Sequence, residues 1–330
     1  MKNDYLDMKK QLDKELDKFG NVQSLMRYFD ENNLYKLHLK LDGNKATGVD
    51  KVTKREYCEN ASDNIINLVG RMKTGKYKPL PVRRVSIPKP NGKQRPLGIP
   101  SYEDKIIQSR IAQILNIIFE RYFKDFSYGF RPNRDCHQAI KRIDEIIMHG
   151  KTNVIVEADI KGFFDHVDHD ILIRMLEVVI KDKDFIWLIK KFLKAGYIQN
   201  DTFHETEIGT PQGGLISPIL ANLYLHVVLD NWFDNEIKQL CKGEAQIVRY
   251  ADDFVCMFQY DSDARMFYQM LIERFAQFKL EIEETKTKIF TFGRNSKENN
   301  TFDFLGFTIS NGRIIEYNPL VKPKITYPLW

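Results

Sequence analysis

Short apolar runs separated by polar turns are the most regular pattern in the chain. Residues 153–159 read N-V-I-V-E-A-D and are rich in β-branched side chains, which predicts a strand that ends at Asp159. Residues 246–250 and 254–258 are two further runs of this kind, separated by the stretch A-D-D. The pattern therefore predicts one strand and, later in the chain, a two-stranded hairpin.

The rest of the chain alternates between helical and strand patterns. Apolar residues at helical spacing predict short helices within 1–40 and longer ones at 54–73, 103–124, 136–149, 168–181, 184–196, 216–240 and 262–278. Strand patterns predict a hairpin within 82–100, a polar hairpin near 198–208, and strands near 280–284, 287–292 and 302–309. This order predicts an α+β fold whose centre is a split β-α-β sheet covered on one face by helices.

Length and composition favour a soluble nucleic-acid-binding protein. A chain of 330 residues with 43% hydrophobic residues can form two or three domains or subdomains. The net charge is only +5, but residues 72–95 are basic, contain no acid, and interleave Tyr, Pro and Gly. That composition is typical of a nucleic-acid or phosphate-binding surface, and a solvated basic loop is the alternative.

Cysteine spacing and hydropathy exclude several classes of protein. The four cysteines form no C-x-x-C pair, so we expect neither a zinc site nor a disulfide framework, and a reducing compartment fits. The first residues lack the apolar core of a signal peptide, and no stretch approaches 18 uncharged apolar residues. We therefore expect a cytoplasmic protein with no membrane partner.

The adjacent acids Asp252 and Asp253 allow two interpretations. Asp is a favoured turn residue, so the pair could be a solvated hairpin turn. Alternatively, both could bind a divalent metal, which prefers oxygen ligands. Asp159 also ends an apolar strand and could lie beside them, although it could instead be a helix N-cap or turn residue. Two metal ions between such carboxylates catalyse in-line phosphoryl displacement in polymerases and nucleases.

Three motifs carry a family resemblance. D-I-K-G-F-F-D at 159–165, G-T-P-Q-G-G-L-I-S-P-I-L-A-N-L-Y-L at 209–225 and Y-A-D-D at 250–253 resemble the A, B and C motifs of reverse transcriptases, in order and spacing. S-Y-G-F-R-P-N-R-D-C-H-Q-A-I at 127–140 is similar to the bacterial group II intron branch. The resemblance runs from about residue 34 to about residue 310, and it implies a right-hand polymerase with fingers and palm.

The resemblance implies roles for residues of motifs A and C. Asp159, Asp252 and Asp253 correspond to the aspartates that bind two Mg²⁺ ions, for which Mn²⁺ can substitute, and Asp252 is the firmer direct ligand. Ile160 would offer a backbone carbonyl. Phe164 matches the aromatic steric gate, a flat ring that clashes with a ribose 2′-hydroxyl.

Other positions are implied to bind the incoming nucleotide or to donate a proton. Lys89 and Arg95 match the fingers residues that bind the triphosphate, as suits a basic hairpin, and Ala251 lies on the nucleotide side of motif C. Gln212 lies in a Gly-rich turn, where Gly213 and Gly214 allow the backbone to come close to the incoming nucleotide. Lys286 matches the lysine proposed to protonate pyrophosphate, with Lys288 as the alternative.

Several motif residues have a structural alternative. Residues 302–307, F-D-F-L-G-F, resemble the primer grip but could equally be a core strand. Arg131 could lie on the template side of the fingers or be a buried structural arginine. Phe163 is expected in the core, and His137 and His166 are expected to be structural.

We expect an N-terminal extension at 1–75 that contacts RNA, fingers at 76–150, a palm at 151–310, and the start of a connection to an absent thumb at 311–330. The implied function is RNA-directed DNA synthesis from a DNA or RNA primer, with deoxynucleoside triphosphates and an RNA template, in support of intron mobility. Its own intron RNA is the expected template, and a homodimer is possible. Two alternatives are a splicing cofactor that mainly binds intron RNA, and a group II-like enzyme adopted for phage defence.

Overall fold

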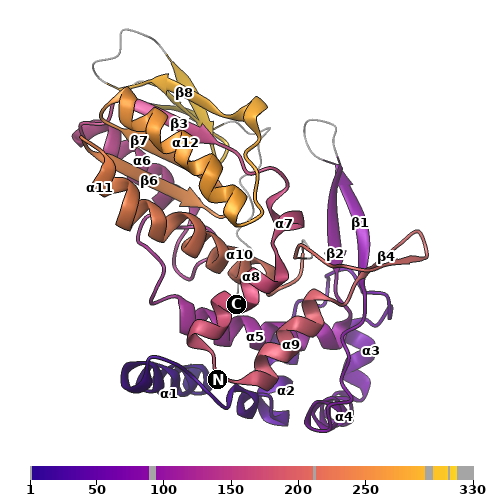
Figure 1. The fold of residues 1–330 in the computed structure, drawn as a ribbon. Coiled ribbons are helices and arrows are strands. Elements are labelled where there is room, and N and C mark those ends of the chain that lie inside the picture. Colours follow the sequence, from indigo (N-terminus) through magenta and orange to yellow (C-terminus); the bar gives the residue numbers. More distant parts are fainter. Residues whose placement is uncertain (1, 89–93, 211–212, 294–299, 311–312, 318–330) are drawn as a thin grey trace. The chain divides into compact units, whose positions relative to one another are not determined.

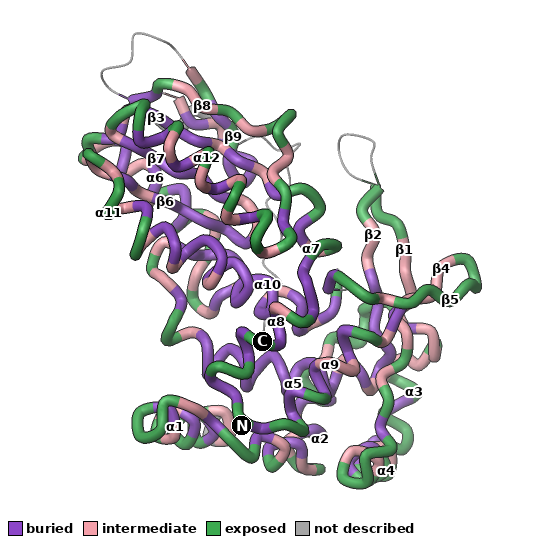
Figure 2. Tube along the Cα trace, in the orientation of Figure 1, coloured by how far each residue is buried: buried purple, intermediate pink, exposed green. Residues whose placement is uncertain are grey.

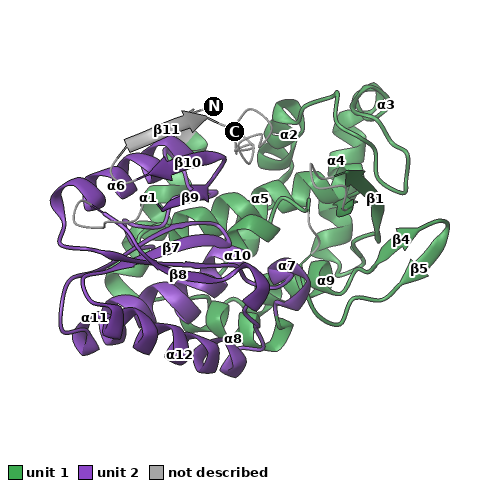
Figure 3. Ribbon diagram, turned by 90° about the horizontal axis from the view of Figure 1, so that it is seen from above, with its two compact units in different colours: residues 1–121, 168–220, 330 green, residues 122–167, 221–329 purple. Residues whose placement is uncertain are grey.

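The computed structural model describes residues 2–88, 94–210, 213–293, 300–310 and 313–317, and these form two compact units (Figure 3). Unit 1 contains residues 1–121 and 168–220. Unit 2 contains residues 122–167 and 221–329. Each unit is therefore built from separate stretches of sequence.

Unit 1 is a helical assembly around one buried helix. Its helices are α1 (Lys2–Phe19), η1 (Leu25–Tyr28), α2 (Glu31–Lys40), α3 (Lys54–Glu59), α4 (Ala61–Lys73), α5 (Tyr102–Phe119), α8 (His169–Val179) and α9 (Lys183–Leu193). Nearly every residue of α5 is buried, including polar side chains such as Gln108, Arg110 and Asn116, so this helix lies inside unit 1 (Figure 2). Helix α5 ends at Phe119, so the predicted helix 103–124 was too long. Phe123 fits the helical spacing of apolar residues, but it lies after the last turn of the helix and is buried there.

A small sheet of unit 1 carries the basic hairpin. The strands β1 (Val82–Pro88), β2 (Gln94–Ile99), β4 (Tyr197–Gln199) and β5 (Thr202–His204) lie in the order β2-β1-β4-β5. Strands β1 and β2 are antiparallel, with Ile87 opposite Arg95, so the predicted hairpin is confirmed. Its turn, residues 89–93 with Lys89, lies outside the described residues. Strands β4 and β5 are the predicted polar hairpin.

Unit 2 is centred on a four-stranded antiparallel sheet (Figure 1). The strands β3 (Val154–Ala158), β6 (Ala245–Tyr250), β7 (Asp253–Phe258) and β8 (Lys288–Thr291) lie in the order β6-β7-β3-β8. Because each neighbouring pair is antiparallel, β3 runs parallel to β6 with β7 between them, and β7 runs parallel to β8 with β3 between them. This is the predicted split β-α-β arrangement, formed twice.

Both faces of this sheet are covered. Helix α12 (Asp261–Gln277) packs on β3 and β7. On the other face, Ile155, Val255 and Met257 join a cluster with helix α6 (Cys136–His149) and apolar residues of 302–309. The sequence predicted helices on one face of the sheet, and the structure has a second covering layer on the other face.

Two predicted strands take a different form. Residues 302–309 form a hairpin of β9 (Thr301–Phe304) and β10 (Phe307–Ser310), joined at Leu305 and Gly306 with φ angles of 55° and 86°. Positive φ at both positions is typical of a tight hairpin turn. The third strand, β11 (Arg313–Tyr317), pairs with β10. Residues 280–284 form no strand, since only Ile282 makes an isolated bridge, to Ile160.

The predicted helix 216–240 is wound unevenly. It consists of α10 (Ser217–Leu225), two π-helical segments at His226–Asp230 and Phe233–Ile237, and α11 (Lys238–Leu240). Short π segments often mark functional positions in a helix. The short helices α7 (Phe163–His166) and η4 (Glu284–Lys286) complete unit 2. Among all the helices described, none is long and apolar enough to cross a bilayer.

Helix α5 buries a carboxyl group in its first turn. Asp104 accepts hydrogen bonds from the Tyr77 hydroxyl and, at 2.9 Å, from the Leu80 N–H, so it joins the end of the α4–β1 connection to the helix. Burial raises the pKa of Asp104 to about 6, against the opposing effect of these hydrogen bonds. The folded protein therefore holds this proton at pH values where the unfolded chain has lost it.

We predict that Asp104→Asn removes a pH-dependent part of the stability. In the wild-type protein, the contribution of Asp104 is complete below pH 4 and is lost as the pH rises through about 6. A shift of this size corresponds to at most about 3 kcal/mol. Urea denaturation of both proteins at pH 4.5 and 7.5 measures the effect. Parallel stability curves for the two proteins would contradict it.

Candidate active site

The register of strands β3 and β7 brings two aspartates opposite each other. Ala158 at the end of β3 pairs with Phe254, and the antiparallel alignment continued by one residue sets Asp159 opposite Asp253. Directly opposed residues in such a pair have Cα atoms about 4.5–5.5 Å apart. Two carboxylates from distant parts of the sequence therefore meet at one end of the sheet.

The third aspartate lies in the turn between β6 and β7. Tyr250 pairs with Asp253, which leaves Ala251 and Asp252 as a two-residue turn. Ala251 is buried and has a φ of 57°, a conformation that is uncommon for residues other than glycine. Asp252 and Asp253 are both half-buried. The hairpin turn that the sequence allowed is thus also the place where the acidic pair lies.

A lysine neutralises one of these carboxylates. The Lys286 ammonium, at the end of η4, donates a hydrogen bond to Asp159, and this contact raises the pKa of Lys286. Lys288 lies instead on β8, opposite Glu157. Of the two lysines that the sequence left open, Lys286 is therefore the one that contacts a motif aspartate.

Glu157 extends the acidic group along β3. It stands two residues before Asp159, so the two side chains share a face of the strand. Burial raises the pKa of Glu157; Lys288 opposes this, and the negative charges of Asp303, Asp159 and Asp253 raise it further. The site thus concentrates more negative charge than the three motif aspartates alone.

The oxygen donors at this end of the sheet suit a hard divalent cation. Within the part of the chain that the structure describes, no three acidic, histidine or cysteine side chains converge closely enough to coordinate a metal as they stand. One of the candidate donors, Asp159, is engaged by Lys286. The hydrogen bonds of the bridge between Ile160 and Ile282 are made by the Asp159 carbonyl and the Lys161 N–H. The Ile160 carbonyl therefore points away from that bridge.

The two phenylalanines after motif A differ in burial. Phe163 is buried and lies 5.4 Å from Phe164 and 6.4 Å from Tyr224 between ring centroids. Phe164 is only half-buried. Phe163 is therefore the core residue that was expected, and Phe164 has an accessible ring, as a contact with a sugar requires.

In unit 1, two side chains hold the ends of the motif B loop. His169 Nε2 lies 2.6 Å from the Gly209 carbonyl oxygen, and the Gln108 side-chain oxygen accepts a hydrogen bond of 2.8 Å from the Leu215 N–H. Gln212 itself lies outside the described residues. Sequence reasoning missed both anchors, although a glutamine within the apolar pattern of α5 is a signal for a buried polar contact.

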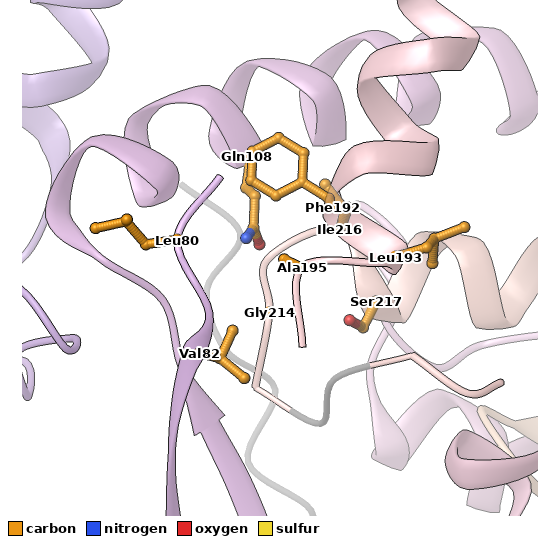
Figure 4. A pocket seen from close by; sticks show the side chains of 9 residues that line it. All are labelled: Leu80, Val82, Gln108, Phe192, Leu193, Ala195, Gly214, Ile216 and Ser217. Carbon is orange, nitrogen blue, oxygen red and sulfur yellow. The ribbon is translucent and has the colours of Figure 1, made fainter. Parts of the chain in front are cut away.

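Gln108 also lines a small cavity behind this loop (Figure 4). The cavity volume is about 10 Å³, which is room for about one water molecule. Its other lining residues are Leu80, Val82, Phe192, Leu193, Ala195, Gly214, Ile216 and Ser217. The loop is thus packed on a largely apolar base.

Gly213 explains why this loop needs glycine. Its φ is 105°, and a Cβ at this position would lie 2.6 Å from the Gly98 carbonyl oxygen. The backbone at Gly213 therefore packs closely against strand β2, a contact that the sequence did not predict. The same strand carries Arg95, whose side chain is exposed.

The remaining motif residues have structural contacts. Arg131 is buried, and its Nη1 donates hydrogen bonds of 2.6 Å to the carbonyls of Lys124 and Ser127. The ring of His137 lies edge-on to Phe307, and His166 Nδ1 lies 2.9 Å from the Gly162 carbonyl oxygen. The apolar residues of 302–307 belong to the core cluster of unit 2. These contacts favour the structural alternative for Arg131.

Comparison with known proteins identifies the family of this chain. The family model described as reverse transcriptase (RNA-dependent DNA polymerase) matches residues 87–309. The group II intron-encoded protein LtrA of Lactococcus lactis subsp. cremoris is 49% identical over 167 residues, which cover 50% of this chain and 28% of that protein. Protein YkfC of Escherichia coli K12 is 36% identical over 248 residues, covering 67% of this chain and 65% of YkfC.

A solved structure shares the fold. Telomerase from Candida albicans, in complex with a fragment of telomeric RNA, aligns with a TM-score of 0.59 at 12% identity, over 85% of this chain and 53% of that one. Because the family model matches more than half of the chain, at residues 87–309, the chain belongs to the reverse transcriptase (RNA-dependent DNA polymerase) family. Its relatives are of the group II intron type, as the sequence predicted, and it spans about a quarter of the length of LtrA. Enzymes of this family use divalent metal ions.

We predict that Lys286→Met increases the affinity of the site for a divalent cation. Lys286 contacts Asp159, so a cation binding at this carboxylate would have to compete with the ammonium, and loss of the ammonium would free one donor. Because the pair is partly exposed, its energy is about 1 kcal/mol or less, and the expected gain in affinity is up to about fivefold. Titration with Mn²⁺ followed by electron paramagnetic resonance measures it, with Asp159→Asn as the control that weakens binding. Unchanged or weaker binding in Lys286→Met would contradict the competition.

We predict that Gly213→Ala raises the KM for the nucleotide, whereas Gly75→Ala does not. Both glycines have a positive φ, so both variants incur a backbone strain of about 1 kcal/mol. Only at Gly213 would the new Cβ press on a backbone carbonyl, since nothing lies within 4 Å of the Cβ position at Gly75. Steady-state kinetics and urea denaturation of the two variants separate strain from displacement of the loop. Equal KM values would show that the loop position does not affect nucleotide binding.

Proposed function

We propose that the chain is the fingers and palm of a group II intron-type reverse transcriptase that extends a primer on an RNA template. The observation that carries the proposal is the strand register that sets Asp159 opposite Asp253, with Asp252 in the adjoining turn. Carboxylates so arranged in a member of this family suit a pair of Mg²⁺ ions, for which Mn²⁺ can substitute.

In the proposed mechanism, Asp159, Asp252, Asp253 and the Ile160 carbonyl hold the metal ions. When bound, these ions make the primer 3′-hydroxyl more acidic and stabilise the charge on the leaving phosphate oxygen. The 3′-oxygen attacks the α-phosphate of a deoxynucleoside triphosphate, and pyrophosphate leaves. The protein side chains orient both reactants, and such positioning supplies much of the rate of phosphoryl transfer.

Other side chains act on the nucleotide. Lys89 and Arg95 bind the triphosphate, and Arg95 is exposed as this role requires. Gln212 and the backbone at Ala251 adjoin the nucleotide, and Phe164 excludes a ribose 2′-hydroxyl by steric contact. Lys286, whose raised pKa keeps it protonated at neutral pH, can donate a proton to the departing pyrophosphate once it leaves Asp159.

The proposed roles follow the sequence regions. Residues 1–75 contact RNA, 76–150 act as fingers, 151–310 act as the palm, and 311–330 lead toward a thumb. The partners are an RNA template, with its own intron RNA as the first candidate, a DNA or RNA primer and deoxynucleoside triphosphates. Retromobility of the intron, a cytoplasmic location and homodimer formation are part of the proposal.

A second candidate function is splicing assistance through binding of intron RNA. The observation that favours it is a set of relatives named for introns, including the nuclear intron maturase 1, mitochondrial, of Arabidopsis thaliana, which is 31% identical over 100 residues covering 29% of this chain and 13% of that protein. Recognition of a folded RNA rests on shape and phosphate contacts. Splicing assistance therefore predicts tight binding of one intron RNA that is unaffected by Asp252→Ala.

We predict that the protein adds one deoxynucleotide to a DNA primer annealed to RNA, in the presence of Mg²⁺ and with enzyme in excess. Single addition is the chosen readout because it does not depend on how long the enzyme stays bound. Asp252→Ala should reduce the rate by at least about 10³-fold, since it removes a proposed metal ligand.

The control is Asp261→Ala, because Asp261 is an exposed acid that pairs with Arg265 on the surface of α12, and this variant should keep the wild-type rate. No addition by the wild-type protein, or full activity in Asp252→Ala, would refute the polymerase proposal. RNA binding that persists in both variants would then favour the splicing cofactor.

A further inference from the structure

A completely buried arginine lies directly before the turn that carries Asp252. Arg249 on β6 has no exposed surface, although a charged side chain is costly to bury unless it is paired and hydrogen-bonded. Its Nε donates to Asp230 Oδ1 at 2.7 Å, and its Nη2 donates to Asp230 Oδ2 at 2.5 Å. This two-point contact fixes the plane of the guanidinium group.

The partner Asp230 is also completely buried, and it ends the π-helical segment His226–Asp230. Burial is the largest single influence and would raise the pKa of Asp230, but the charges and hydrogen bonds of Arg249 and His226 together outweigh it and lower this pKa. The pair is therefore ionised, and each charge depends on the other. His226 Nδ1 lies 3.8 Å from the same carboxylate.

The remaining donor atom of the guanidinium group reaches the turn itself. Arg249 Nη1 donates to the Ala251 carbonyl oxygen at 2.9 Å and to the Asn222 side-chain oxygen at 3.0 Å. The Ala251 carbonyl belongs to the peptide that leads into Asp252. Since Ala251 has a positive φ, this peptide is held in a conformation that an alanine rarely adopts without support.

The turn is supported by a second segment as well. Asn222 Nδ2 donates to the Gly129 carbonyl oxygen at 2.7 Å, and a Cβ on Gly129 would lie 2.4 Å from the Ala251 nitrogen. Residues 126–128 also pair with Arg249 through the backbone. The Arg249 N–H donates to the Phe126 carbonyl oxygen at 2.9 Å, and the Tyr128 N–H donates to the Arg249 carbonyl oxygen at 2.8 Å. Residues of three sequence motifs thus meet around one guanidinium group.

We infer that Arg249 is a positioning residue for the catalytic turn, aligned by Asp230 and assisted by Asn222. The guanidinium group holds the peptide between Ala251 and Asp252, so that Asp252 and Asp253 present their carboxylates in a fixed direction. This inference rests on the proposed polymerase function for its kinetic consequence. Its structural consequence, protection of the turn, holds without substrate, metal or turnover.

The experiment uses the double variant Arg249→Met with Asp230→Leu. Replacing both charges by apolar side chains of similar size leaves no unpaired buried charge, and such exchanges are often neutral for stability. The variant nevertheless lacks any donor to the Ala251 carbonyl. The matched control is Arg110→Met, because Arg110 is also buried and donates to a carbonyl, that of Tyr28 at 2.8 Å, in helix α5 of unit 1.

Two readouts separate positioning from general stability. We expect the double variant to keep the urea midpoint of the wild-type protein, while the peptide spanning Tyr250–Asp253 exchanges its amide hydrogens at least about tenfold faster. The rate of single-nucleotide addition should fall by about 10- to 100-fold, with the KM for the nucleotide within about twofold of wild type. Arg110→Met should lower the urea midpoint but keep the exchange rate of that peptide.

Full protection of Tyr250–Asp253 and a wild-type rate in the double variant would overturn the inference. So would an equal loss of rate in Arg110→Met, because the effect would then be general. If the wild-type protein adds no nucleotide, the polymerase proposal fails on its own, and hydrogen exchange still decides the positioning role.

Should the double variant not fold, Arg249→Lys provides the second test. A lysine keeps the charge opposite Asp230, but a single ammonium group cannot hold the carboxylate and the Ala251 carbonyl in the same fixed plane. We expect a stable protein with a faster-exchanging turn and a rate lowered by about tenfold or more. Wild-type exchange and rate in Arg249→Lys would overturn the inference.

Discussion

The pairing register of two strands is the constraint on which the site depends. Asp159 and Asp253 meet only because Ala158 pairs with Phe254, and side chains along a strand alternate between its faces. A slip of β7 by one residue would turn Asp253 to the opposite face of the sheet and remove Val255 from the cluster that it forms with α6. The same buried contacts that stabilise the sheet therefore also set the separation of the carboxylates.

Electrostatic repulsion is the cost of this arrangement. Glu157, Asp159 and Asp253 gather negative charge at one end of the sheet, and the raised pKa of Glu157 reflects both burial and that charge. Lys286 compensates one carboxylate by direct contact, and Lys288 lies opposite Glu157. The two lysines thus offset part of the negative charge that gathers at this end of the sheet.

Much of the fold could be predicted from the sequence, because the patterns that indicate strands and helices involve residues close together in the chain. The strands around Asp159 and Asp252 were found from short β-branched runs, and their spatial order from the alternation of strands and helices. The hairpin at Leu305 and Gly306 was missed although the alternation changes phase there, with Phe302 and Phe304 in one phase and Phe307 and Ile309 in the other. The extent of the helix after residue 103 was overestimated because Phe123 is buried outside it.

The supporting residues of the site were harder to find than the motif residues. Arg249 stands in a strand of buried residues, and a lone charge in such a run is a signal that a buried partner exists. The identity of that partner, Asp230, depends on a π-helical segment that no periodicity argument predicts. Likewise, the contact of Gln108 with Leu215 joins residues too far apart in sequence for local patterns to connect them.

The interleaving of the two units has a consequence for synthesis on the ribosome. Residues 1–121 cannot complete unit 1 until residues 168–220 have left the exit tunnel, and unit 2 starts in the interval between them. At about 5–20 residues per second, this wait lasts roughly 5–20 s. During that time the apolar surface of helix α5 lacks part of its cover, so a nascent chain has a window in which chaperones can bind it.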